Sequence, residues 1–242
     1  MKASCVLIPY QFSTAGLGIM NQGSGNLVQN KSDWELSLEQ AIKRNKKIVD
    51  KMIIINRLMN FKQVNSILKK FGFLNFKQII RSCPDDVVAD IAFAAFEADT
   101  EEVLIVSEAS DSILNDEEYS IVIKEAKDLA AFGNIVRVDF QSVSFTEKGS
   151  KQILDTDQTI YCFKAAVYLD ELLRYDPAVY QTVKRAHFKK SNSFVNELLD
   201  EMIPRHSFDE AIINKSNLVK ILKYKIKLKN KTSLNQNVFV KN

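Results

Sequence analysis

The stretch Glu102-Val103-Leu104-Ile105-Val106-Ser107 decides the fold class. Its apolar residues are consecutive, which is typical of a parallel strand buried on both faces. We predict helices on either side of it, at about 85–97 and 117–132, and shorter strands at 76–81 and 135–140. Strands that alternate with helices in this way predict a parallel sheet with right-handed crossovers.

The N-terminal part begins with a predicted strand at 3–12, followed by a glycine-rich loop at 13–30. The glycines of this loop are Gly16, Gly18, Gly23 and Gly25. Their spacing fits neither the dinucleotide fingerprint nor the P-loop, so we favour a hairpin or mobile loop and predict no cofactor-binding residue. The capping signal Ser32-x-x-Glu35 predicts a helix that runs to about Asn60, and a second helix is expected at 61–71, ended by Gly72.

The second half of the chain reads as consecutive helices from about Asp157 onward. Its last stretch, 214–229, begins as an amphipathic helix and then alternates apolar residues with lysines. That alternation is equally typical of an edge strand, whose lysines would prevent edge-to-edge pairing. We therefore predict a parallel-sheet α/β domain at 1–150 and a helical region with a Lys-rich tail at 151–242.

Charge is unevenly distributed along the chain, whose formal net charge is +3. Residues 43–81 hold eleven basic residues and one acid, residues 84–128 hold fourteen acids, and residues 211–242 hold eight lysines and no acid. The basic and acidic blocks either face each other in the fold, or the basic block presents a surface to an anionic partner.

Carboxylates follow the central predicted strand, where ligands bind in open α/β sheets. Glu108, Asp111 and Asp116 come after it, and Asp86 and Asp90 lie one turn apart on the preceding helix. Carboxylates that converge there would hold Mg²⁺ or Mn²⁺ for phosphodiester hydrolysis. The alternative is a solvated acidic surface, or a set of partners for the basic block.

The run from Pro84 to Asp90, followed by Val103 to Asp111, resembles the second half of PIN-like nuclease domains, including the NYN type. The resemblance implies a PIN-like or Rossmann-like parallel sheet flanked by helices, with Asp86 and Asp111 as metal ligands and Glu39 as a looser candidate. Together with the acidic cluster, this gives the catalytic residues Asp86, Glu108 and Asp111 and the metal ligands Asp86, Asp111 and Asp116. The family places an essential Asp at the end of the first strand. This sequence has Pro9-Tyr10-Gln11 there, which indicates a degenerate member.

Basic side chains interleave with phenylalanines at 61–81, and a second basic stretch surrounds His187. Basic residues neutralise phosphates and exposed aromatic rings stack on bases, although these phenylalanines are equally expected in the core. The residues that we predict to contact nucleic acid are Lys62, Lys69, Lys70, Lys77, Arg81, Lys184 and Arg185.

Two hypotheses follow. The first is a nucleic-acid-associated protein with a PIN-like or Rossmann-like domain, a metal-dependent nuclease that is degenerate or active. The second is a non-enzymatic interaction subunit of a larger assembly, such as a phage, mobile-element or defence system, with a protein partner or second copy. The sequence leaves open whether the protein is an enzyme. Its apolar runs are too short to span a membrane, so we expect a cytoplasmic protein.

Overall fold

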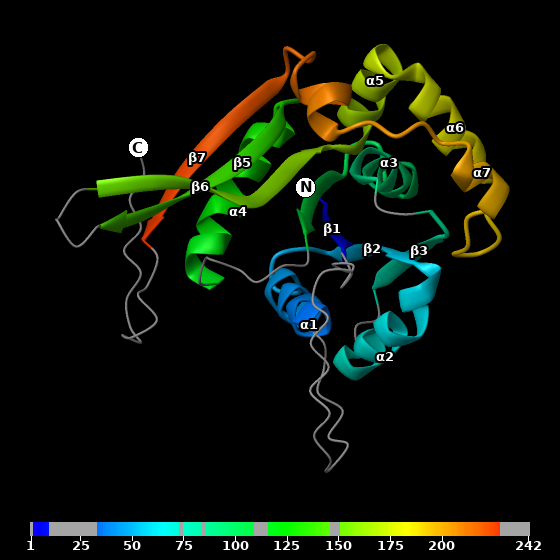
Figure 1. Cartoon of the computed structure of the whole chain (residues 1–242), viewed down its shortest axis with the longest axis horizontal. Helices are drawn as coiled ribbons and strands as arrows, with labels where there is room; N and C mark the ends of the chain where they lie inside the picture. The colour runs from blue at the N-terminus through cyan, green and yellow to red at the C-terminus, as the bar shows by residue number, and fades with distance from the viewer. Residues whose placement is uncertain are drawn as a thin grey trace, which may run out of the picture.

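The computed structural model describes residues 2–9, 33–72, 75–83, 86–108, 116–145 and 151–227. In this part of the chain one sheet has seven strands in the order β3-β2-β1-β4-β6-β5-β7 (Figure 1). The strands are β1 (Ala3–Ile8), β2 (Lys51–Arg57), β3 (Phe76–Arg81), β4 (Val103–Glu108), β5 (Ile135–Phe145), β6 (Lys151–Lys164) and β7 (Val219–Lys227). The helices are α1 (Asp33–Asn45), α2 (Phe61–Phe71), α3 (Val87–Glu97), α4 (Asp116–Ala131), α5 (Ala165–Tyr175), α6 (Pro177–Phe188) and α7 (Glu197–Glu201), with short helical turns η1 (Leu58–Asn60) and η2 (Asp209–Ile213).

The sheet is mostly parallel, as the sequence predicts. β1 pairs in parallel with both β2 and β4, through the partners Ile53 and Val106 of Val6, while β6 is antiparallel to its neighbours β4 and β5. Val103–Val106 are at most 3% exposed and lie at the centre of the sheet. The prediction of an α/β sheet built around this strand is therefore confirmed.

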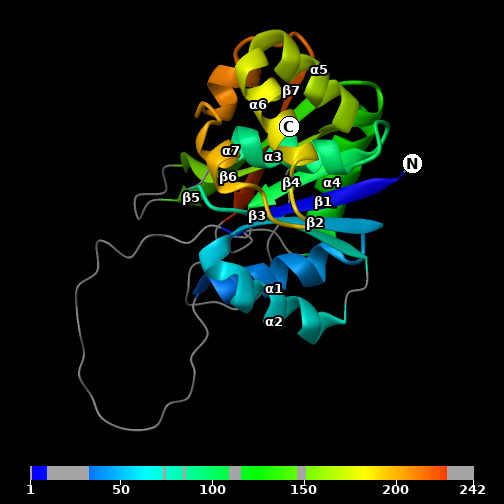
Figure 2. The same cartoon turned by 90° about the vertical axis from the view of Figure 1, so that its right-hand side faces the viewer.

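Helices cover both faces of the sheet because alternate residues of each strand point to opposite sides. Cys5 and Leu7 pack against α1 and α2, and Ile105 packs against α4. Val6 and Val106 belong to the opposite core, which contains α3, α5 and α6. Figure 2 shows α1 and α2 on one side of the sheet and α3, α5, α6 and α7 on the other.

Two parts of the structure differ from the sequence expectation. The helix expected to continue to Asn60 ends at Asn45, and Met52–Ile55 are fully buried in strand β2. A run of four apolar residues buried on both faces fits a central strand, whereas a helical face would use only some of them.

The region after residue 150 contributes helices α5, α6 and α7, and it also contributes two strands, β6 and β7, to the sheet. β7 is the edge strand that the alternation of apolar residues and lysines allows. The division of the chain into domains at residue 150 stays a prediction. In the described part of the chain, no helix is both long and apolar enough to cross a membrane.

Candidate functional site

The carboxyl ends of β1 and β4 lie side by side, with Ile8 paired to Glu108. In the strand order, β2 and β3 lie on one side of β1 and β4 lies on its other side. The chain passes from β1 to β2 and β3, and α3 then leads back to β4. In open α/β sheets such a reversal of strand order leaves a crevice in which ligands bind. Residues 10–32 and 109–115, which follow β1 and β4 in the sequence, lie outside the described residues, and the predictions for Gly16–Gly25 and Asp111 lie there with them.

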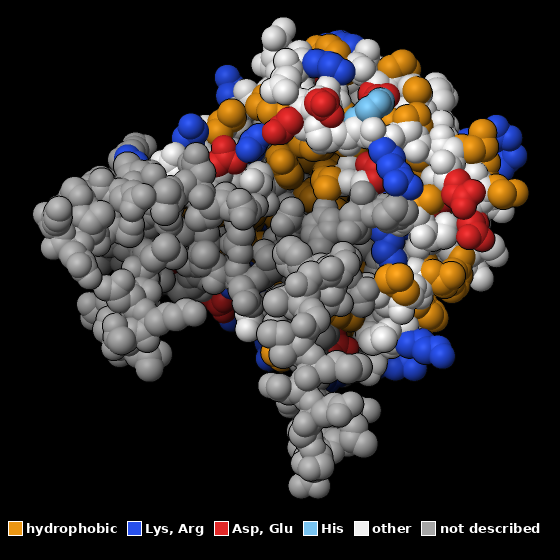
Figure 3. Space-filling view, viewed as in Figure 1, with side chains coloured by type: hydrophobic (Ala, Val, Ile, Leu, Met, Phe, Trp, Pro, Cys, Tyr) orange, Lys and Arg blue, Asp and Glu red, His pale blue; other side chains and the backbone are white. Residues whose placement is uncertain are grey.

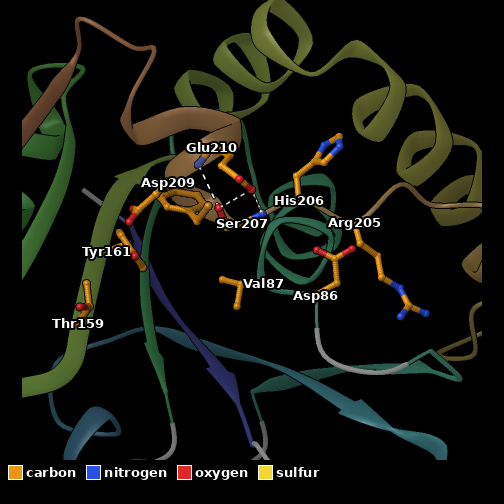
Figure 4. Close-up of a pocket in the computed structure, with 10 residues that line it drawn as sticks. Asp86, Val87, Thr159, Tyr161, Arg205, His206, Ser207, Asp209 and Glu210 are labelled. Carbon is orange, nitrogen blue, oxygen red and sulfur yellow. Dashed lines mark hydrogen bonds between the residues drawn. The ribbon is translucent and has the colours of Figure 1, made fainter.

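A pocket of about 550 Å³ opens beside this crevice, on the face of the sheet that carries α3. One wall is the start of α3 and the other is β6, and segment 205–210 closes the space between them (Figure 4). The lining residues are Asp86, Val87, Thr159, Tyr161, Arg205, His206, Ser207, Phe208, Asp209 and Glu210. The pocket combines charged groups with a Tyr and a Phe ring, as expected for a small polar ligand with an apolar surface.

Asp86 is the N-cap of α3 and is 6% exposed. Its Oδ1 accepts the backbone N–H of Ala89 at 3.2 Å, which satisfies one free donor of the first helical turn. Its buried Oδ2 has no hydrogen-bond partner within the described residues. Burial raises the pKa of Asp86 above its usual range, outweighing the opposing effects of the Ala89 N–H and Arg81.

A buried ionic network fixes the first turn of α3 to the ends of β2 and β3. Arg57 donates to both carboxylate oxygens of Asp90, at 3.1 and 2.8 Å, and Arg81 donates to Asp90 Oδ1 at 2.6 Å. Arg81 also donates to Asp200 of α7 at 2.8 Å, and Asp200 accepts the backbone N–H of Cys83 at 2.9 Å. These bonds hold α3 and α7 in place and so position the pocket wall that carries Asp86.

Segment 205–210 is held by polar contacts at several points. Ser207 donates to Glu210 at 2.8 Å and accepts the Glu210 N–H at 3.2 Å, which is a capping box. His206 Nδ1 bonds Asp176, the N-cap residue of α6, and Figure 4 shows its ring turned away from Val87 and toward the helices. His206 therefore anchors the segment and lines the pocket from its rim.

Arg205 is exposed, and no hydrogen bond or ion pair involves its guanidinium in the described part of the chain. Arg205 is thus a cation of the pocket that remains available for an anionic ligand.

The other wall of the pocket is also ordered by contacts. The ring of Tyr161 lies 4.4 Å from that of Phe208. Asp209, near the end of segment 205–210, accepts a hydrogen bond from Arg137 at 2.9 Å.

The structure separates the acidic residues that the sequence proposes as a metal site. Asp86 lines the pocket, whereas Asp116, at the start of α4, pairs with Lys47 at 2.9 Å and with Arg44 at 3.6 Å. Lys47 is the main cause that holds the pKa of Asp116 below its usual range. Among the residues that the structure describes, no three His, Cys, Asp or Glu side chains gather to hold a metal ion. The roles of Glu108 and Asp111 stay predictions.

The basic residues predicted to contact nucleic acid do not form one surface. Lys62, Lys69 and Lys70 are exposed on α2, whereas Lys184 and Arg185 are exposed on α6 across the sheet (Figure 2).

The remaining two have other partners: Lys77 bonds Glu97 at 2.5 Å, and Arg81 is 1% exposed within the ionic network. On the described part of the face in Figure 3, Lys and Arg side chains are scattered among acidic and apolar ones. A continuous basic track for a phosphate backbone is absent from this part of the surface.

Sequence reasoning missed the side of the pocket made by segment 205–210 and Tyr161. One signal was available, since Ser207-x-x-Glu210 follows Pro204 and has the spacing of a capping box. Arg205 carries no such signal, because only the packing of this segment against α3 and β6 brings it to the pocket.

No model of a known protein family and no curated protein matches this sequence. Solved structures do match, over nearly the whole chain. A mannose-6-phosphate isomerase from Helicobacter pylori is 20% identical with a TM-score of 0.69, and the match covers 92% of this chain and 97% of that chain. A Thermus thermophilus protein described as a mannose-1-phosphate geranyltransferase is 12% identical with a TM-score of 0.60, covering 92% and 73%. A CMP:2-keto-3-deoxy-manno-octonic acid synthetase in complex with CTP is 8% identical with a TM-score of 0.50, covering 93% and 90%.

These likenesses show the Rossmann-like α/β fold that these solved proteins share, so the resemblance to PIN-like nucleases is wrong. The short acidic motifs that suggested it have other uses here, since Asp86 caps a helix and Asp90 is enclosed by two arginines. The expectations of a nucleic-acid-binding protein, of an active or degenerate nuclease, and of nucleic acid as the partner are wrong as well. The alternative of a non-enzymatic interaction subunit has no counterpart among these solved proteins, which are described as an isomerase, a transferase and a synthetase.

Proposed function

We propose that the protein is a sugar-phosphate nucleotidyltransferase. A phosphate oxygen of the sugar phosphate attacks the α-phosphorus of a nucleoside triphosphate, the bond from that phosphorus to the bridging oxygen breaks, and pyrophosphate leaves. The observation that carries the proposal is a polar pocket at the carboxyl edge, beside the reversal of strand order between β1 and β4. The solved proteins of this fold support it, since two are described by a mannose phosphate and a third is bound to CTP.

In this proposal the pocket holds the sugar phosphate. Arg205 at its rim is a cation without a protein partner in the described residues, and a guanidinium suits a phosphate group because it donates two parallel hydrogen bonds. The Tyr161 ring offers a flat surface for a sugar ring. The nucleotide would then occupy the neighbouring crevice, where β1 and β4 end.

Nucleotidyl transfer uses Mg²⁺ or Mn²⁺ to neutralise charge on the phosphates. The donor chemistry of this chain fits such an ion, because the backbone of Glu108 ends β4 at the crevice and Asp111 follows three residues later. Carboxylate oxygens are the ligands that these cations prefer. We propose Glu108 and Asp111 as the residues that would hold the ion.

Pyrophosphate release tests the proposal, with ATP, GTP, CTP and UTP each combined with a set of hexose 1- and 6-phosphates in Mg²⁺. We expect release that requires both one nucleotide and one sugar phosphate. Arg205→Ala should raise KM for the sugar phosphate by about 10- to 100-fold with little change in KM for the nucleotide, because a charge-assisted contact to the phosphate is lost.

Lys184→Ala is the matched control, since it removes an exposed cation of α6 that does not line the pocket. Two outcomes contradict the proposal. One is the absence of release with every pair; the other is formation of a ketose phosphate without nucleotide, which would indicate an isomerase.

A further inference from the structure

The carboxylate of Asp86 has a position in the pocket that its structural role does not explain. One oxygen accepts the Ala89 N–H and completes the cap of α3. The other oxygen is buried and has no partner within the described residues, although the residue lines the pocket and is 6% exposed. A cap needs only one acceptor, and Ser or Asn would supply it without a buried charge.

The protein also leaves Asp86 without a counterion of its own. Arg57 and Arg81, from β2 and β3, act electrostatically on Asp86, but their ion pairs are with Asp90 and Asp200, and Arg81 donates only to the backbone carbonyl of Asp86, at 3.5 Å. A buried acceptor without a partner is destabilising, so such groups are rare unless a ligand or an ordered water completes them. A carboxylate at the wall of a polar pocket, on the helix that borders the crevice, is placed to be completed by a ligand.

We propose that Asp86 is a specificity residue that accepts a hydrogen bond from a sugar hydroxyl, so that the pocket selects a phosphorylated polyol with a hydroxyl at that position. This inference rests on the proposed function and names the group of the substrate that the pocket reads. In this arrangement the phosphate would lie toward Arg205, whose side chain lies beyond Asp86 and is turned away from Val87 in Figure 4. The sugar ring would lie along Tyr161, and the selected hydroxyl would face the start of α3.

A neutral hydroxyl fits this position better than the other donors that a carboxylate could take. A divalent cation needs several oxygen ligands, and Asp86 belongs to no group of three acidic or metal-binding side chains in the described residues. An ammonium group would be repelled by Arg57 and Arg81, whose charges already act on Asp86, and by Arg205 at the rim. A hydroxyl donates to the ionised carboxylate and accepts from its acid form, so it suits a carboxyl group whose pKa burial has raised.

A thermodynamic cycle tests the assignment. The probes are the 1-phosphates and the 6-phosphates of glucose and mannose, with the analogues of each that lack the hydroxyl at carbon 2, 3 or 4, titrated calorimetrically into wild-type protein and Asp86→Asn. Asn keeps the cap but places an amide N–H₂ where the free oxygen stood. We expect one deoxy analogue to bind wild type at least about 10-fold more weakly than its parent, because the buried oxygen then stays without a partner.

The ratio that we compare is the dissociation constant of a deoxy analogue divided by that of its parent. In Asp86→Asn this ratio should fall close to one for the analogue that wild type discriminates, while the ratios for the other deoxy positions stay as in wild type. Asp50→Asn is the matched control: Asp50 also accepts a backbone N–H, that of Ala3 at 3.1 Å, but lies at the other edge of the sheet. It should leave every ratio unchanged. A purely structural Asp86 would weaken all probes by the same factor, and that result overturns the inference.

Titration of the four nucleoside triphosphates into the same proteins separates this inference from the proposed function. If nucleotide and sugar phosphate bind wild type but no deoxy ratio depends on Asp86, the specificity role is wrong and the proposed function stands. If wild type binds neither class of ligand, the proposed function fails and the role of Asp86 fails with it.

Discussion

The two ends of α3 carry acidic residues in opposite situations. At its C-terminal end Glu97 accepts hydrogen bonds from Lys77 at 2.5 Å and from Lys190 at 2.9 Å, with the His187 ring 3.8 Å away. Burial alone would raise the pKa of Glu97, but the two lysines lower it to about 2. At the N-terminal end Asp86 has one backbone partner and a raised pKa.

The ionised carboxylate of Glu97 stabilises the fold, whereas the ionised carboxylate of Asp86 does not. Glu97 is matched with charges and lies away from the pocket, so its ionised form favours the folded state. Asp86 lines the pocket, and its ionised form is disfavoured by burial. Carboxyl groups with pKa values shifted by burial concentrate at functional sites, which makes the start of α3 a place to look for ligand contacts.

The largest loss of stability is expected from the buried ionic network around Arg81. Arg81→Met removes the guanidinium shared by Asp90 and Asp200 and leaves both carboxylates short of a buried partner. We expect the free energy of unfolding to fall by about 3–5 kcal/mol, measured by urea denaturation at pH 7. Lys2→Met, which breaks an exposed pair with Asp99, should cost no more than about 1 kcal/mol. Equal losses in the two variants would mean that the network does not hold the start of α3.

A smaller loss is expected at the other end of α3. Glu97→Gln removes the charge that Lys77 and Lys190 share, and should lower the free energy of unfolding by about 1 kcal/mol at pH 7, because Lys77 is half exposed and water screens its contribution. The folded pKa of Glu97 is lowered to about 2 from 4.5, so its contribution is complete above about pH 4.5 and disappears as the pH falls through 2. Denaturation of both proteins at pH 7 and at pH 2.5 checks this, and a difference that does not shrink on acidification would contradict it.

The smallest effect should have the opposite sign. Asp86→Asn keeps the cap and removes a disfavoured charge, so at pH 7 the variant should be slightly more stable than wild type, by at most about 1 kcal/mol. Because the folded pKa is raised, the deficit of wild type is present at high pH and closes as the pH falls toward the unfolded value of 3.8. Thermal denaturation from pH 8 to pH 4 measures the gap. A variant less stable than wild type at pH 8 would show that the Asp86 carboxylate has a partner in solution.

Local sequence patterns predicted those helices and strands whose ends and burial depend on their own residues. The helix Phe61–Phe71 ends at Gly72, with a left-handed φ of 54°, as its sequence indicates. The strand around Ile105 is buried on both faces, as its unbroken apolar run requires. The sequence predicts a helix over Met52–Ile55 because Met52 and Ile53 can share an apolar helical face with Leu38 and Ile42. Only pairing with β1 and β3 selects the strand.

The candidate site could be predicted only in part. Its position at the carboxyl edge and the presence of Asp86 follow from the order of elements and the acidic block. Its second wall does not, because Tyr161 and Arg205 reach the pocket only through β6 and segment 205–210, which are distant in the sequence from α3. The prediction that Arg81 contacts nucleic acid failed for the same reason, since its partner Asp200 is 119 residues away.

The sequence by itself determined that this chain forms an α/β sheet around Val103–Val106, because consecutive apolar residues between helical segments must be buried on both faces. It also indicated that a helix begins near residue 85, because an oxygen side chain followed by Pro, as in Ser82-x-Pro84, is typical of a helix start. The structure places the cap at Asp86. Only the tertiary structure decided that Asp90 has two arginine partners while one oxygen of Asp86 has none in the described residues. That outcome depends on which side chains arrive from β2, β3 and α7, and electrostatic pairing acts across space whatever the separation in sequence.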